Sequence, residues 1–69
     1  MKYKILDMVL LNKEIHHQAS LYGRMGTIVE IYTHPNLAYE IEFCDDNGKT
    51  IGIITLSESE MDNYLVIKQ

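Results

Sequence analysis

Three histidines and one cysteine are the residues of this chain that could hold a metal ion or act as a nucleophile: His16, His17, His34 and Cys44. Imidazole nitrogen and thiolate sulfur both suit zinc or nickel. Adjacent histidines point in different directions in regular structure, however, and no CxxC or HxxxH pair anchors a site. The spacing therefore predicts no metal ion, no cofactor and no Cys–His nucleophile pair. Since the chain also lacks a phosphate-binding loop and a Ser-His-Asp arrangement, we expect no enzymatic activity.

The acidic residues form a second set, which follows a regular pattern. Residues 39–43 alternate between apolar and acidic side chains, so Glu40 and Glu42 should occupy the outward face of a half-buried strand. Glu30, on the strand before, is expected to share that face, and Tyr32 offers an aromatic anchor with a polar tip. The candidate partner-binding residues are Glu30, Tyr32, Glu40, Glu42, Asp45 and Asp46.

Two other interpretations of these acidic residues stay open. The first is a solvated sheet face, because charged residues mostly lie outside for no functional reason. Like charges facing one another across strands destabilise a sheet slightly, though, and a basic partner would compensate for this. The second is a paired-carboxylate hydrolase, which needs a substrate cleft for which so small a chain has little room.

Length and charge limit the function further. A chain of 69 residues allows one domain, residues 1–69, and its net charge of -4 is opposite to that of a typical nucleic-acid binder. The single cysteine indicates a reducing cytoplasm, and the longest apolar stretch, Met8 to Leu11, is far too short to span a membrane. We therefore expect a protein partner with a basic surface, and self-association remains open.

The elements that must position these residues are mostly strands. Ile, Val and Thr gather in short runs separated by turn residues. Asn47-Gly48 predicts a hairpin with a type I′ turn, Gly52 predicts a bend or bulge, and the capping-box spacing of residues 57–60 leaves room for at most one helical turn. The pattern predicts an all-β fold, a small five-stranded SH3-like barrel. Its strands are expected at residues 5–11, 27–32, 39–43, 50–56 and 64–67.

Two resemblances carry additional expectations. Residues 23–32, in which the Gly23–Gly26 turn enters an apolar strand, resemble the KOW-type motif of SH3-like barrels in elongation factors and ribosomal proteins. More of the chain is similar to a small bacterial family, the domain of unknown function 4926. The segments that carry this similarity are Tyr3-Lys4-Ile5-Leu6-Asp7, Val9, Gly26-Thr27-Ile28-Val29-Glu30, Tyr39-Glu40-Ile41-Glu42-Phe43, Asp46-x-Gly48-x-Thr50 and Thr55-Leu56-Ser57.

Neither resemblance brings a catalytic residue. Genes of the small bacterial family often neighbour genes for toxin-like proteins, so the resemblance implies a binding role. We expect a non-enzymatic protein-binding module, of which an antitoxin- or immunity-type inhibitor of a basic toxin is one form. The alternative is a KOW-like RNA- or ribosome-associated module that works through the Gly23–Gly26 turn.

Overall fold

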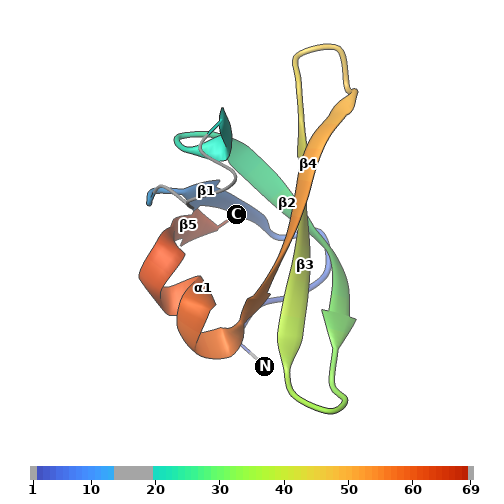
Figure 1. Cartoon of the computed structure of the whole chain (residues 1–69), viewed down its shortest axis with the longest axis vertical. Coiled ribbons are helices and arrows are strands. Elements are labelled where there is room, and N and C mark those ends of the chain that lie inside the picture. Colours follow the sequence, from blue (N-terminus) through green and yellow to red (C-terminus); the bar gives the residue numbers. More distant parts are fainter. Residues whose placement is uncertain (1, 14–19, 69) are drawn as a thin grey trace.

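The computed structural model describes residues 2–13 and 20–68, which form one sheet and one short helix (Figure 1). The strands are β1 (Met8–Leu11), β2 (Met25–Tyr32), β3 (Ala38–Cys44), β4 (Thr50–Ser57) and β5 (Leu65–Lys68). The helix α1 (Glu58–Tyr64) connects β4 to β5. The predicted mostly-β fold is therefore confirmed, with strands two to four within two residues of their expected limits.

All pairings in the sheet are antiparallel, and the strand order is β4-β3-β2-β1-β5. The strands β4 and β5 lie at its two edges, and within the described residues no pairing joins them. The predicted closure into an SH3-like barrel is thus not confirmed. A physical reason is the position of α1. This helix contacts both β4 and β5 and lies where hydrogen bonds between these two strands would close the sheet.

The inner face of the sheet holds the hydrophobic core, and no polar side chain is buried there among the described residues. Strand β3 supplies the centre of this core through the side chains that alternation predicted to face inward. Met61 of α1 and Leu21, from the segment before β2, cover it. The fully buried side chains are Val9, Leu11, Leu21, Ile28, Tyr39, Ile41, Phe43 and Met61.

The helix is longer than predicted. It contains seven residues where at most one turn was expected, so that expectation was wrong. The capping box itself is confirmed, because the Ser57 N–H donates to Glu60 Oε1 at 2.9 Å and the Glu60 N–H donates to Ser57 Oγ at 3.3 Å. Burial of Met61 against the sheet explains the second turn, since packing stabilises short helices more than intrinsic propensity does.

The first strand is shorter than predicted. It begins at Met8, and residues 4–7 form a turn in which Asp7 N–H donates to the Lys4 carbonyl at 3.0 Å. Leu6 has a φ of 74° in this turn and is 71% exposed, so it belongs to neither the strand nor the core. The apolar run over residues 5–11 was therefore misleading at its start.

The hairpin between β3 and β4 forms where predicted, but its turn type was predicted wrongly. A type I′ turn needs positive φ at two residues, whereas Gly48 has φ 83° and Asn47 does not have a positive φ. The Asp45 N–H donates to the Lys49 carbonyl at 2.8 Å, which leaves a loop of three residues. The Asp45 carboxylate selects this loop by accepting the N–H groups of Asn47 and Lys49, each at 2.9 Å.

Two glycines act through close contacts. Gly26 was expected in a turn but lies within β2, where an added Cβ would come within 2.6 Å of Ile41 Cγ2. Gly52 lies beside a bulge, as predicted, because the β3–β4 register shifts by one residue and leaves Ile51 as the extra residue of β4. The hairpin beyond this bulge projects from the rest of the molecule (Figure 1).

Candidate functional site

The side of the sheet opposite the core is the candidate site, and we call it the outer face. A bulge in β2 determines which residues reach it. Ile28 pairs with Ile41 but Glu30 pairs with Glu40, so Val29 is an extra residue on β2. Strict alternation would have put Glu30 on the same side as the buried Ile28. The bulge reverses this and turns Glu30 outward, directly opposite Glu40.

The structure brings together three of the sequence-predicted residues on this face. Tyr32 lies two residues beyond Glu30, and its hydroxyl donates to Glu40 Oε1 at 3.1 Å. This hydrogen bond to a carboxylate is the main cause of a raised pKa of Tyr32. Tyr32 is therefore neutral near pH 7 and remains 41% exposed.

Glu42 occupies the next outward position of β3. It lies between Thr27 of β2 and Ile53 of β4, and its carboxylate accepts a hydrogen bond from the Thr50 hydroxyl. Glu40 and Glu42 thus each have a hydroxyl partner, and among the described residues no cation pairs with either of them. The strands β2, β3 and β4 contain no lysine, arginine or histidine. Within the described part of the chain, the ion pair that forms lies elsewhere, between Lys2 and Asp62.

The two remaining predicted residues do not join this cluster. Asp45 directs its carboxylate to backbone N–H groups inside the β3–β4 loop, so it has a structural role there. Asp46 is exposed at the tip of the same loop. The acidic part of the outer face therefore consists of Glu30, Glu40 and Glu42, with Tyr32 beside them.

Sequence reasoning missed the exposed apolar residues of the outer face. Met8 pairs with Thr27, and both Met8 and Met25 project from this side at 39% and 40% exposure. Ile53 is 48% exposed and lies directly opposite Glu42. The apolar residues around Ile53 in the sequence do not separate inward from outward positions, because the bulge at Ile51 interrupts the alternation of β4.

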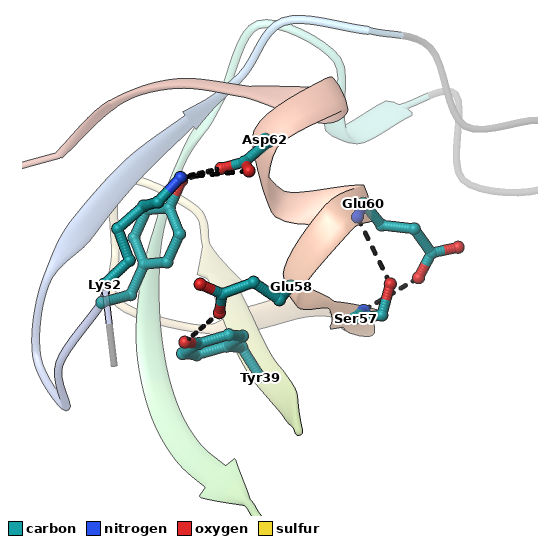
Figure 2. Close-up of polar contacts among 7 residues, drawn as sticks. Lys2, Tyr39, Ser57, Glu58, Glu60 and Asp62 are labelled. Atoms are coloured by element: carbon teal, nitrogen blue, oxygen red, sulfur yellow. Dashed lines mark hydrogen bonds and ion pairs between the residues drawn. The ribbon is translucent and has the colours of Figure 1, made fainter. Parts of the chain in front are cut away.

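A second polar cluster, also missed, lies at α1 (Figure 2). The Tyr39 hydroxyl donates to Glu58 Oε1 at 2.5 Å, and the Tyr3 hydroxyl donates to Asp62 Oδ1 at 3.1 Å. Lys2 Nζ also binds Asp62, at 2.9 Å from Oδ1. The four-residue spacing of Glu58 and Asp62 indicates a shared helix face, but nothing in the sequence identifies their partners.

The chemistry of this second cluster is structural. Burial, together with the hydrogen bond to Glu58, raises the pKa of Tyr39 to about 12. Tyr39 therefore stays protonated near pH 7 and acts as a donor that holds α1 on the sheet. The ring of Tyr3 packs edge-on against that of Tyr39, with centroids 5.4 Å apart, so the segment before β1 is fixed to the same place.

The remaining candidate residues are separated. His34 lies in the turn before β3 and the exposed Cys44 ends that strand, so the two stand at its opposite ends. His16 and His17 lie outside the described residues. Over residues 2–13 and 20–68, no group of three His, Cys, Asp or Glu side chains is placed to hold a metal ion. The helix found in these ranges is too short to cross a membrane.

Together, the open sheet and the outer face define a small antiparallel β protein with an acidic surface on β2, β3 and β4, three strands that contain no lysine, arginine or histidine. A family model described as a domain of unknown function, DUF4926, matches residues 5–63. The chain belongs to this family. Searches of curated proteins and of solved structures returned no match.

Proposed function

We propose that the protein is a non-enzymatic module that binds a basic protein through its outer face. The observation that carries this proposal is the charge of the strands β2, β3 and β4. They present Glu30, Glu40 and Glu42 on one side and contain no cationic residue to neutralise them.

The mechanism has two parts. Negative charge on the face attracts a basic partner and raises the rate of encounter. Exposed apolar side chains then supply the buried centre of the contact, for which Tyr32, Met25 and Ile53 are available at 40 to 48% exposure. An inhibitor that covers a basic, toxin-like protein would use such a face, and this is the biological role we infer.

Two of the six cationic residues of the chain are engaged within the fold, which supports a protein partner over RNA. Arg24, within the Gly23–Gly26 segment, donates from Nε to the Ser20 carbonyl at 3.2 Å, and Lys2 is paired with Asp62. A nucleic-acid site would need several cations along one groove. Titration with generic RNA at low salt tests this point, and binding that weakens steeply with salt would favour the RNA-associated alternative.

Charge reversal tests the proposal directly. The triple variant Glu30→Lys, Glu40→Lys, Glu42→Lys should remain folded, because each outer-face substitution is expected to change stability by about 0.5 kcal/mol or less. Its affinity for the protein that co-purifies with the wild-type chain should fall at least about 100-fold, and the wild-type association rate should fall as salt rises through about 0.15 M. Isothermal titration calorimetry, after circular dichroism confirms folding, measures the affinity.

A matched pair of single variants provides the control. Glu40→Lys and Asp46→Lys change the net charge equally, but Asp46 lies at the hairpin tip away from the cluster. We expect a large loss of affinity for the first and a small one for the second. Equal affinities of the wild type and the triple variant would show that the outer face is only a solvated surface.

A further inference from the structure

The free edge of β4 is a feature that the proposed function does not use. β4 pairs with β3 along one side, and in residues 2–13 and 20–68 no strand pairs with its other side. An edge strand presents unpaired backbone N–H and C=O groups, which are a template for another strand. Proteins usually protect such edges with charged residues, proline or bulges.

Apart from its contact with α1, the helix that follows it directly, β4 has little protection of this kind. Its eight residues, Thr50–Ser57, include no charged residue and no proline. Its bulge lies near the start of the strand, at Ile51. From Gly52 to Ser57 the register with β3 continues without a shift, so this part of the edge is regular.

The edge also adjoins the acidic cluster. Thr55 pairs with Glu40, and Ile53 pairs with Glu42. Neighbouring strands lie about 4.8 Å apart, so a strand added to β4 would be about 10 Å from β3. Thr55 is short and exposed, so a long cationic side chain on the added strand could pass over it to Glu40.

We propose that the edge of β4 accepts an extended basic segment of the partner as an additional strand of the sheet. Backbone hydrogen bonds to β4 provide the pairing, and lysine or arginine at alternate positions of the segment meets Glu40 and Glu42 on the outer face. This inference rests on the proposed function, because it uses the same acidic face.

Charge selects this occupant over a second copy of the chain. Pairing two β4 strands would place the Glu40 and Glu42 carboxylates of both copies on one continuous face. Each copy also carries a net charge of -4. Like charges oppose such an association, whereas an alternating basic segment neutralises the cluster.

A peptide tests the proposal without altering the protein. The probe is the capped peptide Val-Lys-Val-Lys-Val-Lys-Val, and its dissociation constant is measured by fluorescence anisotropy. Two isomers each carry three backbone N-methyl groups, on the last three valines or on the three lysines, so each keeps the charge and loses N–H donors along one edge. We expect the parent to bind and the two isomers to differ at least about tenfold, because only one keeps the amides that face β4.

Two protein variants provide the matched comparison. Thr55→Lys puts a cation on the edge, and Asn63→Lys adds the same charge at an exposed position of α1. Thr55→Lys should weaken peptide binding at least about tenfold and Asn63→Lys less than about twofold.

The possible failures are distinguishable. Strand addition is wrong if both N-methylated isomers bind as well as the parent peptide. It is also wrong if the parent peptide does not bind while the triple glutamate variant still loses the co-purified partner. In both cases the proposed function stands. If the triple glutamate variant binds both the peptide and the co-purified protein as tightly as the wild type does, both proposals fail. A stable dimer of the chain alone in light scattering, abolished by Thr55→Lys, would assign the edge to a second copy and overturn the proposal.

Discussion

Two tyrosine–glutamate pairs in this molecule have the same chemistry and different surroundings. Tyr39 is buried and donates to Glu58 at 2.5 Å, between the sheet and α1. Tyr32 is exposed and donates to Glu40 at 3.1 Å, on the outer face. The first pair connects two elements that are distant in sequence, whereas the second connects neighbouring strands that β2–β3 pairing already holds. We infer that the first stabilises the fold and that the second is available for binding.

Alkaline pH should have the largest effect on this comparison. The pKa of Tyr39 is raised from 10.0 to about 12 in the folded chain. Its contribution to stability is therefore complete below pH 10 and is lost as the pH rises through 12. A difference of two pKa units corresponds to about 2–3 kcal/mol, which urea unfolding between pH 8 and pH 12 would measure. A Tyr39→Phe variant whose stability declined equally over this range would contradict the assignment.

Removal of each hydroxyl should give a smaller and more direct contrast. Tyr39→Phe leaves the Glu58 carboxylate without its donor and should lower the free energy of unfolding by about 2 kcal/mol. Tyr32→Phe should leave the stability unchanged, because water can replace the exposed hydroxyl as donor to Glu40. Urea denaturation at pH 7 measures both, with the exposed Tyr22→Phe as control. Equal losses at positions 39 and 32 would remove the distinction.

Removal of the carboxylate charges should give the smallest effects, with opposite signs. Glu58→Gln weakens the bond to Tyr39 and should lower stability by about 1 kcal/mol. Glu30→Gln relieves repulsion with Glu40 directly opposite and should raise stability by about 0.5 kcal/mol. Thermal melts in low salt would show both shifts, and added salt should reduce the gain from Glu30→Gln. A loss of stability in Glu30→Gln would mean that the outer carboxylates support the fold.

The sequence allowed the central strands to be predicted because their signals are local. Alternation over residues 39–43 correctly identified the inward side of β3, and Gly48 marked the hairpin. The capping box at Ser57 and Glu60 was also visible from spacing alone. In each case a few neighbouring residues determine the backbone, so tertiary structure is not needed to interpret them.

What could not be predicted depends on contacts between distant segments. The second turn of α1 forms because Met61 packs on the sheet, and this helix lies between the edges that were expected to close. The hydrogen bond between Tyr39 and Glu58 joins residues 19 positions apart. The expected outward position of Glu30 is observed, but it depends on the Val29 bulge, which the pattern does not reveal.

The bulge at Val29 makes the length of β2 as important as its composition. Deleting Val29 would remove the bulge without moving Glu30 to the core, because Ile28 and Glu30 would then be neighbours in strict alternation. If Val29 stayed and the bulge closed, Glu30 would face the core while Ile31 faced water. β2 should therefore tolerate the deletion of Val29 better than the deletion of either of its neighbours.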